Sequence, residues 1–157
     1  MGFEFDVKSS AAFEEIRRRY PDGAAALLPA LRLVEEQQGC VNDEAVGYVA
    51  DRLNVPRALA QGAFTFYTHF RRSSDGRYAI CICRTLSCAL RGSRMLTEHL
   101  KERLKVGGGG TTPDGKFTLK EVECLGACGG APAAEIGGRC FENLTAAELD
   151  RILDGLK

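Results

Sequence analysis

The side chains best suited to chemistry in this 157-residue chain are four cysteines in two short clusters. The first cluster is Cys83-x4-Cys88 and the second is Cys124-x3-Cys128. Four convergent thiolates are what an iron–sulfur cluster requires, but two cysteine pairs also suit a structural zinc ion with four thiolate ligands. The spacing by itself leaves both kinds of metal centre open.

The charge of the chain gives no general attraction to nucleic acid or to an anionic membrane. Lys and Arg together number 21, as do Asp and Glu, so any partner must be recognised locally. No apolar run approaches the roughly 20 residues of a membrane span, and the first residues lack the character of a signal peptide. We therefore expect the chain in the cytoplasm, or at the cytoplasmic face of a membrane within a larger complex. In that reducing compartment, seven cysteines favour metal binding or redox chemistry over structural disulfides.

Residues 1–72 are predicted to form an N-terminal helical bundle. Apolar residues recur at helical spacing in two stripes: Phe13, Ile16 and Tyr20, then Leu27, Leu28, Leu31 and Val34. Pro29 is expected either to kink the second helix or to mark its true start near Leu28. Asn42 is expected to cap a third helix, and Pro56 to lie in the first turn of a fourth. Short connections between these helices indicate a packed antiparallel bundle.

Residues 73–157 have a different periodicity, which predicts a second domain. The apolar run Tyr78–Cys83 predicts a central strand that is buried on both faces. A helix is expected from Cys88 to about Leu104, with Met95 in its apolar stripe. We expect the next strand over Phe117–Cys124 and, after it, a hairpin that turns at Gly137-Gly138. A last helix is expected to begin with the capping box Thr145-x-x-Glu148. The order β-α-β-β-α is compatible with a thioredoxin-like α/β sandwich, so the predicted fold class is α+β, a helical bundle followed by that domain.

The four cysteines lie where backbone geometry favours thiolates. Cys83 ends the first predicted strand, Cys88 begins the following helix, and Cys124 ends the next strand. Free amides and the dipole at a helix N-terminus favour the thiolate form. Glycines 126, 129 and 130 surround Cys128 and allow backbone N–H groups to approach sulfur.

An iron–sulfur centre at these cysteines would need such donors because of its charge. Two ferric ions, two sulfides and four thiolates sum to minus two, and reduction by one electron makes the centre more negative still. A partly buried site must offset that charge with dipoles or cations. Arg84 and Arg91 are available for that purpose.

Two other functions compete with an iron–sulfur centre. One is a zinc-stabilised adaptor module that binds partners through its helices and moves no electrons. Zinc usually stabilises domains too small to build a core, whereas this domain has enough apolar residues to fold without it. The other is thiol–disulfide exchange, which uses Cys-x-x-Cys in thioredoxin-type proteins, a motif that this chain lacks.

A longer stretch around the second cysteine pair resembles a known family signature. It runs Asp114-Gly-Lys-Phe117-Thr118-x5-Cys124-Leu125-Gly126-x-Cys128-x2-Ala131-Pro132. This is similar to the signature of the small thioredoxin-like [2Fe–2S] subunit of NADH:quinone oxidoreductase (complex I). The segments 63–67 and 76–78 also resemble that family, so the likeness covers nearly the whole chain.

The resemblance implies one [2Fe–2S] cluster with Cys83, Cys88, Cys124 and Cys128 as its ligands. It also implies a non-catalytic electron carrier whose partner is an FMN- and NADH-binding flavoprotein subunit of the same complex. Counterparts of the family occur in NAD-linked formate dehydrogenases and in hydrogenases, and the sequence does not choose among these complexes. In agreement, the chain has no dinucleotide fingerprint and no nucleophile–base pair of its own.

The other cysteines and the two histidines are expected to be structural. Cys81 points to the same face as Cys83, but it lies within an apolar strand and is expected to be a core residue. Cys40 and Cys140 have no partner cysteine at metal-ligand spacing. His69 and His99 are potential ligands by type, but four well-spaced cysteines leave no vacancy for them.

Overall fold

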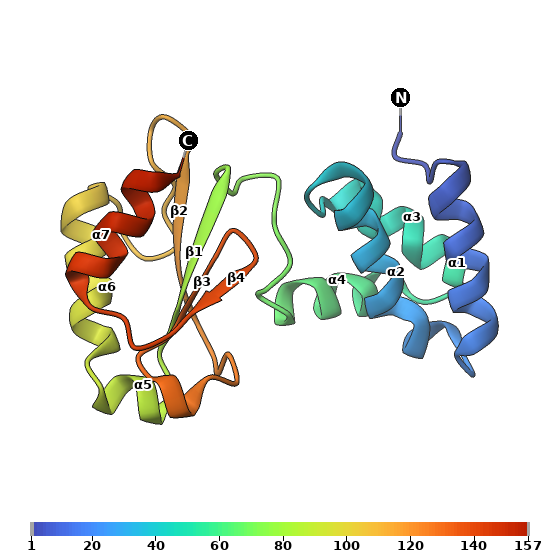
Figure 1. The fold of residues 1–157 in the computed structure, drawn as a ribbon. Coiled ribbons are helices and arrows are strands. Elements are labelled where there is room, and N and C mark those ends of the chain that lie inside the picture. Colours follow the sequence, from blue (N-terminus) through green and yellow to red (C-terminus); the bar gives the residue numbers. More distant parts are fainter. Residues whose placement is uncertain (1, 157) are drawn as a thin grey trace. The chain divides into compact units, whose positions relative to one another are not determined.

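The computed structural model describes residues 2–156 and divides the chain into two compact units, residues 1–73 and 74–157. The first unit is helical, and the second combines a sheet with helices (Figure 1). Each unit has a hydrophobic core of its own. The predicted fold class, helices followed by a thioredoxin-like domain, is confirmed. No helix in the described part of the chain is long and apolar enough to cross a membrane.

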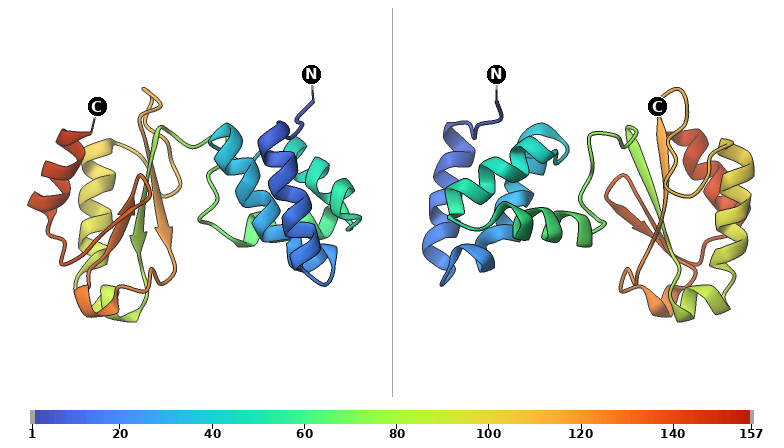
Figure 2. Two further views of the ribbon diagram at one scale, coloured as in Figure 1. Left: turned by 45° about the vertical axis from the view of Figure 1, so that its right-hand side comes forward. Right: turned by 180° about the vertical axis from the view of Figure 1, so that it is seen from behind.

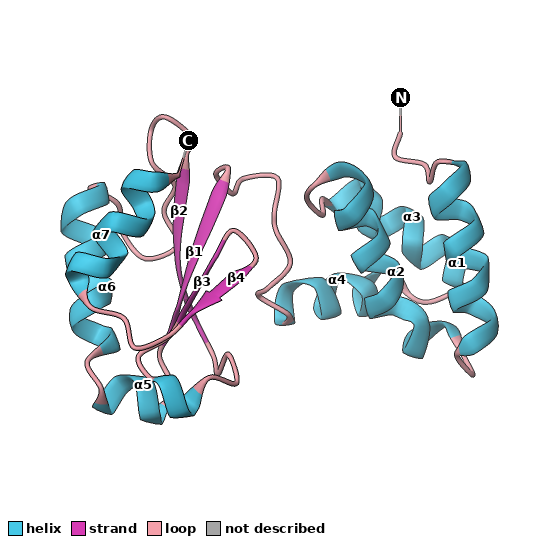
Figure 3. Ribbon diagram, viewed as in Figure 1, coloured by secondary structure: helices cyan, strands magenta, loops and turns pink. Residues whose placement is uncertain are grey.

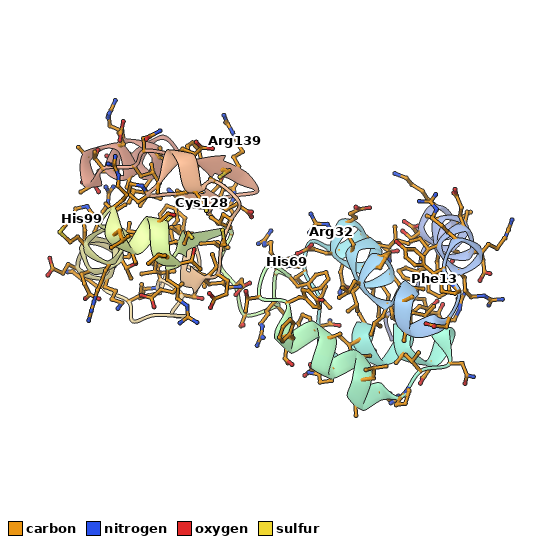
Figure 4. All side chains as sticks on the ribbon, turned by 90° about the horizontal axis from the view of Figure 1, so that it is seen from below. Phe13, Arg32, His69, His99, Cys128 and Arg139 are labelled. Carbon is orange, nitrogen blue, oxygen red and sulfur yellow. The ribbon has the colours of Figure 1, made fainter. Side chains whose placement is uncertain are left out.

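The first unit contains four helices with side-chain caps at three of them. The helices are α1 (Val7–Arg19), α2 (Gly23–Gln38), α3 (Asp43–Leu53) and α4 (Arg57–Phe66). Asp6 and Asp22 cap α1 and α2, and Asn42 caps α3 as predicted, accepting from the Ala45 amide at 2.9 Å. Phe13 is fully buried among these helices (Figure 4).

The start predicted for the second helix near Leu28 is wrong. The helix α2 begins at Gly23, and Pro29 lies inside it. Asp22 fixes the earlier start, because its carboxylate accepts a hydrogen bond from the Ala25 amide at 2.8 Å. Buried residues on both sides of the proline hold the helix against the core, so packing outweighs the one backbone hydrogen bond that Pro29 cannot make.

The second unit is built on a four-stranded sheet in the order β2-β1-β3-β4. Its strands are β1 (Tyr78–Cys83), β2 (Phe117–Val122), β3 (Ala134–Ile136) and β4 (Arg139–Phe141). The central strand β1 pairs in parallel with β2 and antiparallel with β3, and β3 pairs antiparallel with β4. Gly137 and Gly138 both have positive φ, which matches the two-residue hairpin turn predicted at this position.

Two α-helices of this unit cover one face of the sheet. They are α6 (Ser93–Leu104) and α7 (Ala146–Gly155), which lie side by side in every view (Figures 2 and 3). Ile80 and Ile82 of β1 face them and form a core with Leu100 and Leu149. Because side chains alternate along a strand, Cys81 and Cys83 point to the opposite face.

The helix predicted from Cys88 to Leu104 is in fact two helices. The short α5 (Leu86–Leu90) precedes α6, and Gly92 separates them with φ of +92°. A left-handed glycine cannot continue an α-helix, so the chain changes direction there. The spacing predicts Met95 in the apolar stripe, but this residue is 74% exposed, because α6 turns Leu96 and Leu100 inward instead. The second strand also ends at Val122 and not at Cys124.

Candidate metal centre

The parallel pairing of β1 and β2 brings the two cysteine clusters to one end of the sheet. Cys83 is the last residue of β1 and lies opposite Val122, the last residue of β2. Cys124 follows two residues later, and Cys128 opens a short 3-10 helix, η1 (Cys128–Gly130). Cys88 lies in the middle of α5 and not at a helix start. Since the carboxyl ends of neighbouring parallel strands share one sheet edge, both clusters begin at that edge.

The sulfur atoms form two pairs that follow the two sequence clusters. The Sγ atoms of Cys124 and Cys128 lie 3.5 Å apart, and Cys83 and Cys88 interact as a second hydrogen-bonded pair. In a tetrahedral site with metal–sulfur bonds of about 2.3 Å, two thiolates on one metal lie about 3.8 Å apart. Each cluster can therefore supply two ligands to one metal ion.

The two pairs differ in their surroundings. Cys83 and Cys88 are each only 2% exposed and pack with Ala131 and Ala133 in a small apolar cluster. Cys124 and Cys128 are exposed. One side of the site is therefore buried in protein, while the other reaches the surface.

Backbone amides converge on the cysteine sulfurs. The Gly126 amide donates to Cys124 Sγ at 3.3 Å, and Gly126 has φ of +80°, a conformation that glycine adopts without strain. The Leu125 amide donates to Cys83, and the Ala133 amide to Cys88. Gly126 thus brings an N–H donor to sulfur, as the glycine-rich sequence predicts.

Two hydroxyl groups that the sequence reasoning did not single out also bind sulfur. The Oγ1 atom of Thr85 lies 3.2 Å from Cys83 Sγ, and the Ser87 side chain hydrogen-bonds to Cys128. Both residues lie inside the Cys83-x4-Cys88 segment. The signal that could have identified them is the presence of hydroxyl side chains between two cysteines that must fold around one centre.

These hydrogen bonds shift the acidity of the thiols in opposite directions within each pair. Burial opposes ionisation of Cys83, but hydrogen bonds from Thr85 and the Leu125 amide outweigh it and lower the pKa of this thiol. Burial raises the pKa of its partner Cys88. The Gly126 amide lowers the pKa of Cys124, whereas the hydrogen bond to Cys124 raises the pKa of Cys128. Within each pair, one thiol therefore has a lowered pKa and its partner a raised one.

The arginines expected to offset the charge of the site behave differently from each other. Arg84 is exposed and donates through its Nη2 atom to Glu123 Oε1 at 2.5 Å. This carboxylate cancels much of the arginine's charge, so Arg84 contributes less than its position suggested. Arg91 is the C-cap residue of α5 and borders a surface groove beside the site.

The remaining cysteines and the histidines differ in burial and in contacts. Cys81 is 8% exposed, and burial raises its pKa to about 11. Cys40 lies in the first unit, and Cys140 is exposed on β4. The Nε2 atom of His99 lies 2.8 Å from Asp150 Oδ1, and Figure 4 labels His99 and Cys128 at separate places in this unit. His69 packs against the Phe70 ring.

Comparison with known proteins identifies the class to which this architecture belongs. The sequence profile of the thioredoxin-like [2Fe–2S] ferredoxins matches residues 13–157. The chain belongs to this family, and it therefore carries one [2Fe–2S] cluster and transfers electrons.

Within that family, the chain is similar to one particular type of protein. It is 40% identical to an NADH-quinone oxidoreductase subunit of Rhizobium meliloti over 144 residues, which are 92% of this chain and 86% of the relative. It is 35% identical to NADH-quinone oxidoreductase subunit 2 of Thermus thermophilus, covering 100% of this chain and 87% of the relative. The crystal structure of an H2-reduced NAD+-reducing [NiFe]-hydrogenase contains a similar fold, with a TM-score of 0.69 and 26% identity. That match covers 83% of this chain but only 22% of the hydrogenase chain.

Proposed function

We propose that this chain is the [2Fe–2S] electron-transfer subunit of an NADH-quinone oxidoreductase or a related NAD-linked complex. Cys83, Cys88, Cys124 and Cys128 hold the cluster, which exchanges electrons with the FMN of an NADH-oxidising flavoprotein subunit. The observation that carries this proposal is the meeting of two cysteine pairs at one sheet edge, within a chain that matches the family along most of its length.

The donor set fits a binuclear cluster. A [2Fe–2S] centre takes two thiolates at each iron, and the sulfurs here form two separate pairs. Amides of Leu125, Gly126 and Ala133 point at the sulfurs and offset the negative charge that the cluster gains on reduction. The bound cluster supplies the one-electron chemistry. The protein supplies the ligands, the hydrogen bonds to their sulfurs, and the packing that buries one side of the site.

The zinc-stabilised adaptor is supported less well by this geometry. A structural zinc ion needs four ligands arranged tetrahedrally around one point. Within residues 2–156, no group of three or more Cys, His, Asp or Glu side chains is placed to hold one metal ion. Two sulfur pairs match the two thiolates per iron of a binuclear cluster.

An apolar surface beside Cys88 suits the docking of a redox partner. Leu86, Leu90 and Met95 are between 74% and 79% exposed, and they flank Cys88 on α5 and the start of α6. Leu90 and Met95 also line a groove of about 460 Å³. Large exposed apolar side chains that lie close together mark interaction sites. Because electrons must pass close to the cluster, we assign this surface, defined by Leu86, Leu90 and Met95, to the flavoprotein subunit.

Metal analysis and spectroscopy of the purified protein test this proposal. We expect protein purified without oxygen to be reddish-brown, to contain two irons and two sulfides per chain, and to give a [2Fe–2S] electron paramagnetic resonance signal after reduction. Single Cys→Ser changes at the four proposed ligands should remove or severely disturb that signal. Cys81→Ser, Cys40→Ser and Cys140→Ser are the matched controls and should keep it. A colourless protein with one zinc per chain would refute the proposal.

A further inference from the structure

Thr85 occupies a helix-capping position without acting as a cap. It is the N-cap residue of α5, yet its side chain makes no hydrogen bond to the helix backbone. The N-cap residue of α7, Thr145, shows the usual arrangement, because its Oγ1 atom accepts from the Glu148 amide at 3.2 Å. Threonine at an N-cap normally stabilises its helix through that contact. Some other interaction must therefore hold the Thr85 hydroxyl.

The hydroxyl of Thr85 is directed at the cysteine sulfurs. Its Oγ1 atom lies 3.2 Å from Cys83 Sγ, and it also acts as a hydrogen-bond partner of Cys124. Cys83 and Cys124 come from different sulfur pairs. A thiolate bound to iron carries no proton, so the hydroxyl must be the donor, and its single hydrogen points at one of the two sulfurs at a time. One side chain thus reaches one sulfur of each pair.

We infer that Thr85 is a positioning residue that raises the reduction potential of the cluster by donating its one hydroxyl hydrogen bond to a ligand sulfur. This inference rests on the proposed function, in which Cys83 and Cys124 are ligands. Reduction adds one electron to an iron of the cluster and neither makes nor breaks a bond; the electron comes from the reduced flavin, or from dithionite in a titration. A hydrogen bond to sulfur stabilises the more negative reduced state more than the oxidised one.

The expected effect is measurable as a shift in the midpoint potential. Thr85→Val keeps the shape of the side chain and removes the donor. We expect its one-electron reduction to be less favourable by up to about tenfold, which corresponds to about 59 mV toward negative potentials. Thr85→Ser retains a hydroxyl and should stay near the wild-type potential.

A second hydroxyl provides the matched control. Thr97 is also buried in this unit, but its Oγ1 atom donates to the Ser93 carbonyl of its own helix at 3.2 Å. Thr97→Val removes a hydroxyl without touching a cysteine, so it should leave the potential unchanged. Midpoints are measured on the purified full chain by redox titration followed with electron paramagnetic resonance, and iron is counted in each sample.

The outcomes separate this inference from the proposed function. A lower midpoint in Thr85→Val, with full iron content and recovery in Thr85→Ser, supports it. An unchanged midpoint in an iron-replete Thr85→Val protein overturns it while leaving the four-cysteine proposal intact. If Thr85→Val does not load iron, Thr85→Ala provides a second test, and loss of the cluster in both would overturn the inference in favour of a role in assembly. Failure of wild-type protein to hold a [2Fe–2S] cluster would instead refute the proposed function.

Discussion

The backbone conformation of Gly126 determines a hydrogen bond to the exposed cysteine pair. Its left-handed φ of +80° directs its amide at Cys124 Sγ. Gly126→Ala places a Cβ where no atom lies within 4 Å, so crowding contributes nothing and only backbone strain of about 1–2 kcal/mol remains. Relief of that strain should turn the amide away from sulfur. We expect Gly126→Ala protein to lose its visible iron–sulfur absorbance several-fold faster when a chelator is added.

Gly62 provides the control for this glycine substitution. It lies exposed inside α4, with open space around it and an ordinary helical conformation. Gly62→Ala should raise the free energy of unfolding by up to about 1 kcal/mol and leave cluster loss at the wild-type rate. Equal rates of cluster loss in Gly126→Ala and wild-type protein would show that the Gly126 amide is not needed to retain the cluster.

Among the helices, α7 depends on its capping box. The Thr145 hydroxyl accepts from the Glu148 amide, and the Glu148 carboxylate accepts in return from the Thr145 amide at 2.9 Å. Thr145→Ala should lower the free energy of unfolding by about 1 kcal/mol, measured by urea denaturation followed by circular dichroism. Thr145→Ser keeps the acceptor and should lose far less. Since Thr85 does not cap α5, Thr85→Ala should not incur this capping loss.

Local sequence signals predict the elements whose geometry depends on adjacent residues. The Asn42 cap, the glycine pair of the hairpin and the Thr145 capping box all act within a few positions, and all three are confirmed. The break at Gly92 escapes sequence reasoning because the apolar pattern continues across it. There, a left-handed glycine sets α5 apart from α6, which places Cys88 near Cys83 and leaves Met95 in solvent. The direction of the chain after Gly92 depends on contacts across the whole domain, and a local apolar pattern does not encode those contacts.

At the scale of the whole molecule, the apolar surface of Leu86, Leu90 and Met95 predicts where the flavoprotein subunit binds. A Leu90→Glu, Met95→Glu double variant changes only exposed side chains, so folding and the cluster signal should be preserved. Charges on this surface should weaken association with the flavoprotein subunit at least tenfold. Co-purification of that subunit and the rate of cluster reduction by NADH in the mixed proteins measure the effect.

The control for this surface lies on the other unit. Val7 is 91% exposed on α1, and Val7→Glu adds a charge at an apolar position in the unit that carries none of the four proposed ligands. It should leave association and cluster reduction unchanged. Wild-type association of the double variant, or an equal loss in Val7→Glu, would contradict the assignment of the surface.

The family can be read directly from the amino-acid sequence, because it shows in the residue types and their spacing. The iron–sulfur chemistry follows from the family. Those features are local, because a thiolate pair separated by three or four residues can meet one metal ion whatever the rest of the chain does. The burial of one pair and the exposure of the other emerge only from the folded domain. Parallel pairing of β1 and β2 joins residues about forty positions apart, and it is this long-range contact that brings the Thr85 hydroxyl to sulfurs of both pairs.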